Sequence, residues 1–505
     1  MLLGAATLSL VLWAALDQRP PDDHDAWYTH HVIGFMNDLA GMSPPRAVAR
    51  FGFFAWAESD HPPVASIGTW ATLAMFGTSR FVYRMATLPF FLLLVTGATL
   101  AGWELLGRRW GFVTGLLVAG LPSVVNASRK ADFVFHAAGL SAVCLALALG
   151  LALRRPRSLG PWLAFGAVAG LRMNSHSLSV VDLGALAAAL VVLELAARRR
   201  GTEPLRMKPA LLGAGLALVI GAPLLGAPVP GLGMATWSLP KYWHFGGQYV
   251  VGSDPLTLRD VGRAIRFGAL GLTRHHWTPL VAALLFVPGL LAAPWACLAR
   301  ASDDQDARLR DGLRFLGIVV GLQAPVILLT LARGAVLRDW IAVVAASTLL
   351  AVGSLVRVGR RRGFGVGIGR AWAGLLAAHA VFVLFVPAVA SALGPDPLAD
   401  WSAYTRPPVG LFAEFDGRGR EHTHHLVSRT PAPAEAEAPA GRPAGAADLT
   451  FDQLVLSSAV TDRKPAGIGT SFKDGTEVFC FMRVTNPGPA RALRHEWYFE
   501  GTRKS

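Results

Sequence analysis

Acidic and imidazole side chains gather directly after the first apolar run of the chain. Asp22, Asp23 and Asp25 surround His24, and Tyr28 follows them. One carboxylate there could take a proton from an acceptor hydroxyl as a general base, and another could help to hold an acceptor or a divalent cation. A solvated loop beside a membrane, without catalytic function, would have the same composition. Both interpretations stay open on these residues alone.

Later segments combine His, Arg and Asp in a way that suits an anionic substrate. They are Asp60-His61-Pro62-Pro63, Ser128-Arg129-Lys130-Ala131-Asp132, Arg172-Met173-Asn174-Ser175-His176 and Arg274-His275-His276-Trp277. Cationic donors of this kind stabilise negative charge that develops on a leaving group. Each segment also has a simpler interpretation, since Asp132 could be a helix N-cap and the two histidines could form an interfacial belt anchored by Trp277.

The composition predicts that these segments lie on a membrane protein. Of 505 residues, 53% are hydrophobic and only 16% are charged, and the mean hydropathy is +0.43. A soluble domain carries about 25% charged residues. The net charge of +14 does not indicate a nucleic-acid partner, because many basic residues sit in short loops between apolar runs. Three widely spaced cysteines exclude a disulfide framework or a cysteine-rich zinc site.

Apolar runs predict about eleven membrane helices, given that about 20 apolar residues cross a bilayer. They fall at 1–16, 82–106, 111–126, 133–153, 160–173, 178–197, 209–228, 278–298, 314–332, 338–356 and 371–393. We expect the first run to be a retained helix rather than a removed signal peptide, because no basic residue precedes it. The predicted fold class is therefore mainly α, a polytopic helical membrane protein with a small C-terminal β segment outside the membrane.

Basic clusters at alternate loops predict the orientation. Arginines at 108–109, 154–157, 198–200 and 357–362 mark the cytoplasmic side by the positive-inside bias. The N-terminus is then cytoplasmic and the C-terminus extracytoplasmic, in the cell (inner) membrane. The loops 17–80 and 229–277 fall on the outer side and hold much of the His, Trp and Asp content. This arrangement favours a reaction at the outer surface.

The predicted domains are a transmembrane domain over 1–393, a Pro/Ala-rich linker over 394–448 and a small β domain over 449–505, which could be incomplete. Alternating hydrophobicity predicts strands in LTFDQLVLSSAV, TEVFCFMRVTN and ALRHEWYFEG. No catalytic constellation is found in this last part, so we expect it to bind or to act as a spacer.

The order of motifs near the N-terminus resembles a known family. His24-Asp25-Ala26-Trp27-Tyr28 is followed by His61-Pro62-Pro63, then by Phe76-Gly77-Thr78-Ser79, then by Arg84. This order is similar to that of GT-C-fold glycosyltransferases of family 39, the protein-mannosyltransferase and aminoarabinose-transferase type. The family's Asp-Glu pair is absent as such, and its Thr-Lys after a glycine-rich helix is replaced by Arg172 to His176. The glycine-rich stretch 166–171 also fits close helix packing.

The resemblance implies transfer of a sugar from a polyprenyl-phosphate donor to a lipid, glycan or protein acceptor at the outer face. It implies Asp25 as the base, with Asp23 and Asp22 as the alternatives. The implied substrate-binding residues are His24, Tyr28, His61, Arg84, Arg129, Asp132, Arg172, His275, His276 and Arg338. The resemblance does not establish a metal site, although Asp25 and His24 could hold a divalent cation. Membrane lipids are expected partners and nucleic acid is not.

Two other functions stay open at this stage. A transporter or flippase of lipid-linked sugars would show paired charges within its spans and internal repeats. A non-catalytic membrane scaffold would use its extracytoplasmic tail to bind a partner. The altered Asp-Glu and Thr-Lys motifs are compatible with the scaffold.

Overall fold

The computed structural model divides the chain into two units, Met1–His422 and Thr423–Ser505. The boundary lies inside the predicted linker. The residues that the structure describes are 1–16, a few of 42–49, 63–76, 80–128, 133–156, 158–176, 178–199, 201, 207–228, 234–235, 237–240, a few of 257–265, 278–332, 343–364, 366–391, 450–461, 464–468, 479–485, 498–499 and 502–503.

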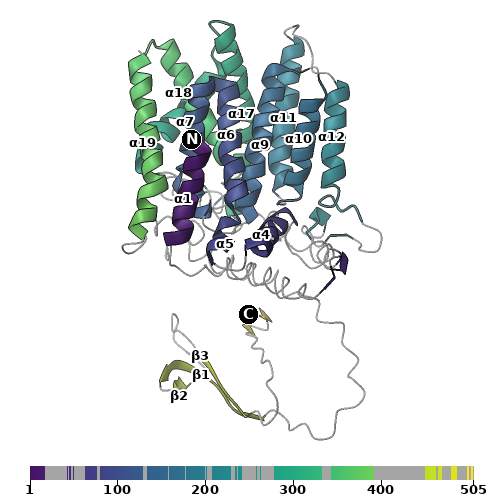
Figure 1. The fold of residues 1–505 in the computed structure, drawn as a ribbon, viewed down its shortest axis with the longest axis vertical. Coiled ribbons are helices and arrows are strands. Elements are labelled where there is room, and N and C mark those ends of the chain that lie inside the picture. Colours follow the sequence, from purple (N-terminus) through teal and green to yellow (C-terminus); the bar gives the residue numbers. More distant parts are fainter. Residues whose placement is uncertain are drawn as a thin grey trace. The chain divides into compact units, whose positions relative to one another are not determined.

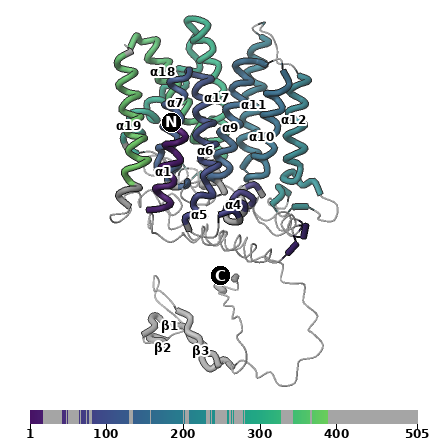
Figure 2. Tube along the Cα trace, in the orientation of Figure 1, coloured from purple at the N-terminus to yellow at the C-terminus, as the bar shows by residue number. Residues whose placement is uncertain are grey.

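Helices make up the described part of the first unit, and Figures 1 and 2 show that the long ones run side by side as a bundle. In chain order they are α1 (Leu2–Leu16), α4 (Pro63–Phe76), α5 (Arg80–Met85), α6 (Leu88–Leu106), α7 (Arg108–Ala119), α8 (Pro122–Ser128), α9 (Phe133–Arg154), α10 (Gly160–Met173), α11 (Ser179–Arg199), α12 (Met207–Gly221), α15 (Pro279–Val281), the π-helical turn η3 (Ala282–Phe286), α16 (Val287–Leu298), α17 (Asp304–Ala332), α18 (Val344–Arg361) and α19 (Val366–Ser391). Each predicted apolar run contains at least one helix.

Two of the predicted runs are broken rather than continuous. The run 82–106 divides at Ala86–Thr87, directly before Pro89 in the first turn of α6. The run 111–126 divides at Gly120–Leu121, before Pro122 at the start of α8. Proline lacks a backbone N–H and begins a helix far more readily than it continues one, which explains both breaks.

Two segments expected to be loops are helical. Helix α4 lies inside the predicted outer loop 17–80 and begins at Pro63. Helix α17 begins at Asp304, ahead of the predicted span 314–332, because Asp303 caps it. The Asp306 backbone N–H donates to the Asp303 carboxylate at 2.8 Å, which is the usual N-cap interaction.

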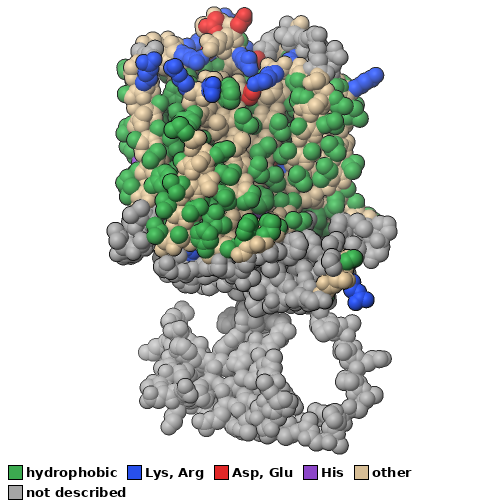
Figure 3. Space-filling view, viewed as in Figure 1, with side chains coloured by type: hydrophobic (Ala, Val, Ile, Leu, Met, Phe, Trp, Pro, Cys, Tyr) green, Lys and Arg blue, Asp and Glu red, His purple; other side chains and the backbone are tan. Residues whose placement is uncertain are grey.

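Four helices in the described part are long and apolar enough to cross a membrane. They are Leu88–Leu106, Phe135–Arg154, Ser179–Arg199 and Gly367–Pro387, and shorter apolar helices accompany them. Figure 3 shows hydrophobic side chains along the sides of the bundle and Lys and Arg side chains at one end. We call this the arginine-rich end, where α7 begins and α9, α11 and α18 end (Figure 1). The terminal turns of these helices hold Arg108, Arg109, Arg154, Arg198, Arg199 and Arg360. The fold is that of a polytopic helical membrane protein.

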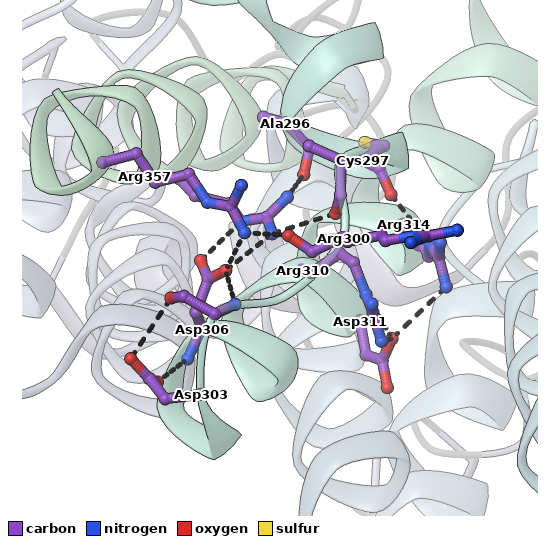
Figure 4. Close-up of polar contacts among 12 residues, drawn as sticks. Ala296, Cys297, Arg300, Asp303, Asp306, Arg310, Asp311, Arg314 and Arg357 are labelled. Carbon is purple, nitrogen blue, oxygen red and sulfur yellow. Dashed lines mark hydrogen bonds and ion pairs between the residues drawn. The ribbon is translucent and has the colours of Figure 1, made fainter. Parts of the chain in front are cut away.

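A buried ion pair fastens three helices at the arginine-rich end (Figure 4). Arg357 was expected in a loop, but it lies in α18 with no exposed surface. Its Nε and Nη2 donate to the two oxygens of Asp306 at 2.6 and 2.8 Å. The same guanidinium donates to the carbonyls of Ala296 and Ala299, at the end of α16. Arg357 therefore caps α16 and binds the first turn of α17.

The second unit contains a three-stranded antiparallel sheet in the order β2-β1-β3 and a two-stranded hairpin. The strands are β1 (Thr450–Thr461), β2 (Lys464–Ile468), β3 (Phe479–Thr485), β4 (Tyr498–Phe499) and β5 (Thr502–Arg503). Strands β3 and β4 fall within predicted strand segments, and β1 matches the first predicted segment, 449–460, but ends one residue later at Thr461. The edge strand β2 was not predicted; Pro465 lies in it opposite Val460, and a proline is tolerated only at such an edge.

Candidate functional site

The candidate site lies at the end of the bundle opposite the arginine-rich end. Helices α4 and α5 lie at that end, where α6, α9 and α11 begin and α10 ends (Figure 1). Four of the sequence motifs lead to this end: the segment before α4, Arg84, the segment after Ser128, and Arg172 to His176. Their described parts are joined by specific bonds.

The first bond joins the Arg84 motif to the Ser128 motif. Arg84 occupies the last turn of α5 and is only 5% exposed. The buried Thr87 hydroxyl lies 2.9 Å from the Arg84 carbonyl oxygen and 2.5 Å from that of Ser128. Ser128 also donates its own hydroxyl to the Val125 carbonyl at 2.8 Å. The backbone leading into Arg129 is thus fixed directly beside the end of α5.

The second bond joins the His-Pro-Pro motif to the turn after α10. The Val64 backbone N–H donates to the Asn174 carbonyl at 3.2 Å. Asn174 is held in turn, because its Nδ2 donates to the Ile220 carbonyl at 2.7 Å and to the Gly170 carbonyl at 3.1 Å. The first turn of a helix has N–H groups without intrahelical partners, so Asn174 supplies an acceptor that α4 needs.

A stacked pair of rings lies against α4. Phe90 in α6 stacks on His136 in α9 with ring centroids 4.2 Å apart, and His136 is fully buried. A Cβ atom added to Gly68 would come within 2.9 Å of the Phe90 ring. Only a glycine therefore lets α4 lie this close to the end of the bundle.

Arg172, the third cation of interest, is fully buried and paired. Its Nε lies 3.0 Å from Asp182 Oδ2 and donates to the Ser141 hydroxyl at 2.7 Å. The Ser141 hydroxyl is 2.5 Å from the same carboxylate oxygen. Nη1 of Arg172 donates to Ser175 Oγ at 3.2 Å and to the His176 carbonyl at 3.3 Å. The described hydrogen bonds and the ion pair of Arg172 thus all join it to other residues of the protein.

Of the predicted site residues, the structure describes Arg84 and Arg172 and brings both to the same end of the bundle. The others lie outside the described residues: Asp22, Asp23, His24, Asp25, Tyr28, His61, Arg129, Asp132, His275, His276 and Arg338. Their assignments stay predictions. Among the side chains that can be examined, no group of three His, Cys, Asp or Glu residues is placed to hold a metal ion.

Sequence reasoning missed Asp182, the partner of Arg172. The available signal was an acidic residue in an otherwise apolar run, ten positions after an arginine. Such residues in a membrane segment are costly unless paired and facing the bundle interior. Asp182 lies in the first turn of α11, so the pair sits close to the end of the bundle.

Part of the chain matches a known protein family. Residues 60–226 match the family described as dolichyl-phosphate-mannose-protein mannosyltransferase. The matched region contains the segments joined by the Thr87–Ser128 and Val64–Asn174 bonds. This part of the chain is similar to GT-C-type glycosyltransferases. The resemblance seen in the sequence is thereby confirmed, while the segment 22–25 precedes the matched region.

Solved structures with low sequence identity resemble this chain. One is ArnT from Cupriavidus metallidurans bound to undecaprenyl phosphate, at 18% identity and a TM-score of 0.48, covering 84% of this chain and 77% of that one. Another is the Archaeoglobus fulgidus oligosaccharyltransferase tethered with an acceptor peptide, at 15% identity and a TM-score of 0.47, covering 88% of this chain. The chain covers 60% of that archaeal enzyme. A comparison with curated proteins gives no match.

Proposed function

We propose that this protein transfers a sugar from a polyprenyl-phosphate donor to an acceptor hydroxyl at the extracytoplasmic face of the membrane. The observation that carries the proposal is that one family match, 60–226, covers the motifs that meet at one end of the bundle. The acceptor is a lipid, a glycan or a protein.

The positive-inside bias supports the orientation in the proposal. The arginine-rich end would be cytoplasmic, which puts the N-terminus inside and the motif-bearing end outside. A polyprenyl chain can then stay in the bilayer while its phosphate and sugar reach that outer end. The apolar sides of the bundle suit such a lipid.

The proposed reaction is a displacement at the anomeric carbon. Asp25, or alternatively Asp23 or Asp22, takes the proton of the acceptor hydroxyl. The hydroxyl oxygen forms the new glycosidic bond, and the bond from the anomeric carbon to the phosphate oxygen breaks. The polyprenyl phosphate leaves with the electron pair, and the configuration inverts. Arg84, Arg129 and the pair His275–His276 would stabilise its new charge.

The remaining predicted binding residues His24, Tyr28, His61, Asp132 and Arg338 would contact the sugar, the phosphate or the acceptor. Arg172 is not among them in this proposal, because it is buried and paired with Asp182. In this proposal a divalent cation assists the transfer but is not required for it. The carboxylate of Asp25 and the imidazole of His24 are donor types that bind such ions, and a bound ion would supply positive charge near the phosphate. Transfer measured with and without EDTA tests this point.

The test of the function is a transfer assay in membranes. Radiolabelled polyprenyl-phosphate sugars are supplied to the wild type and to Asp25→Asn at matched expression. Asp304→Asn, an exposed acid at the arginine-rich end, is the matched control. Label transferred by the wild type and the control but lost in Asp25→Asn supports the proposal. Equal transfer by all three moves the base to Asp22 or Asp23. No transfer from any donor overturns the proposal in favour of a transporter or scaffold.

A further inference from the structure

The buried ion pair between Arg172 and Asp182 offers a function for Arg172 that differs from phosphate binding. The pair joins the last turn of α10 to the first turn of α11, and Ser141 of α9 completes it. Arg172 has no exposed surface and Asp182 is 4% exposed. Two charges buried this deeply are tolerated only as a pair, and removing one partner alone leaves an uncompensated buried charge.

What the pair holds is the turn that follows α10. The Arg172 guanidinium donates to the Ser175 hydroxyl and to the His176 carbonyl, so it binds the turn that directly follows its own helix. The Ser175 hydroxyl and N–H both donate to the Arg172 carbonyl, at 2.7 and 3.1 Å. Hydrogen bonds to the side chain and the backbone of Arg172 therefore stabilise the conformation of this turn.

The 174–176 turn also holds the start of α4. Pro62 and Pro63 have no N–H to donate, so Val64 is the first donor after His61 along the chain. That N–H is bonded to the Asn174 carbonyl in the turn. The start of α4 at Val64 thus depends on the turn, and the turn depends on Arg172.

We infer that Arg172 and Asp182 are a positioning pair, which holds the 174–176 turn and, through the Val64–Asn174 bond, the start of α4. Asp182 Oδ2 balances the charge of Arg172, so the cation is already neutralised before any phosphate arrives. Asp182 Oδ1 is buried and has no hydrogen-bond partner among the described residues. The pair contributes to catalysis only if the proposed transfer is correct.

The decisive variant removes both charges. Arg172→Met with Asp182→Leu leaves no buried unpaired ion, so the protein should fold, whereas either single change leaves one charge without its partner. The double variant also loses the bonds to Ser175 and His176. The double variant therefore shows the effect of losing these bonds in a protein that still folds.

Cysteine labelling reports the position of α4 without requiring activity. Val64→Cys and Met75→Cys are each made in the wild type and in the double variant, and purified full-length protein is labelled with a water-soluble maleimide. Val64 is half-buried at the start of α4, and Met75 is 68% exposed near its far end. The background from the native cysteines is subtracted with the protein that carries neither change.

We expect labelling at Val64→Cys to become several-fold faster in the double variant and labelling at Met75→Cys to stay the same. Where transfer is detected, kcat should fall about tenfold or more, with the donor KM within about twofold, because misplaced groups slow the chemical step more than binding. Unchanged labelling at Val64→Cys overturns the inference, and so does a raised donor KM with an unchanged kcat. Absence of transfer in the wild type defeats the proposed function and leaves the labelling result intact.

Discussion

The Thr87 hydroxyl oxygen lies 2.5 Å from the backbone carbonyl oxygen of Ser128, although the two residues are 41 positions apart in the chain. This contact joins the end of α5 to the segment that leads into Arg129 and Asp132. Both Thr87 and Ser128 are buried, so water cannot replace the bond. The contact places segments that are distant in sequence side by side.

Replacing Thr87 by valine should therefore reduce transfer more than it reduces stability. Valine has the same shape but no hydroxyl, which costs about 1 kcal/mol for the lost bond. The Ser128 backbone would then be free to shift, and with it Arg129. We expect a fall in transfer of about tenfold at near-normal expression, measured in the membrane assay with labelled donor.

Thr87→Ser is the matched control because it keeps the hydroxyl. It should retain most of the activity that Thr87→Val loses. Equal activity in the two variants would show that the Thr87–Ser128 bond does not position the site.

The contact between α10 and α12 gives a second prediction. A Cβ atom at Gly213 would lie 2.5 Å from the Trp162 carbonyl oxygen, whereas one at Gly215 would meet nothing within 4 Å. Gly213→Ala must push the two helices apart, and Gly215→Ala need not. Because α10 carries Arg172, we expect Gly213→Ala to lower both the folded yield and the transfer rate.

The two alanine variants are compared by fluorescence size-exclusion chromatography after heating. Gly215→Ala should melt at or slightly above the wild-type temperature, since alanine favours a helix over glycine by about 1 kcal/mol. A melting temperature for Gly213→Ala that matches Gly215→Ala would mean that α12 moves aside without cost.

The sequence was sufficient to predict the helices but not their interruptions or side-chain partners. Apolar runs near 20 residues predict spans because a bilayer leaves few alternatives to a helix. Pro89 and Pro122 break two of these runs, which a count of apolar residues ignores. Asp303 extends α17 beyond its run because a single side-chain oxygen supplies the cap.

The glycine-rich stretch at 166–171 shows where two interpretations could be separated only by structure. A Cβ atom at Gly166 would lie 2.1 Å from the Gly213 carbonyl oxygen, so close packing explains this glycine. The resemblance implied that Arg172 binds substrate, and no local pattern could reveal that Asp182, on the next helix, would pair with it. Partners on different helices depend on how the helices pack.

A third prediction concerns the ion pair at the arginine-rich end. Asp306→Ala leaves Arg357 buried without its carboxylate and also removes a bond to Arg361. We expect a loss of about 3 kcal/mol in stability, as for other broken buried pairs. Asp304→Ala, an exposed neighbour in the same turn, should change stability by about 0.5 kcal/mol or less. Thermal unfolding of the two variants in detergent measures the difference.

The same pair predicts how stability depends on pH. Asp306 precedes the apolar part of α17, and its hydrogen bond from Arg357 holds the pKa of its carboxyl well below the ordinary value. A lowered pKa in the folded state stabilises the protein above the unfolded pKa, near 3.9, and this contribution is lost as the pH falls toward the folded value. The difference in melting temperature between the wild type and Asp306→Ala should therefore be constant from about pH 8 to pH 5 and should narrow below about pH 4. A difference that instead disappears between about pH 7 and pH 6 would assign the titration to a histidine and remove Asp306 as its source.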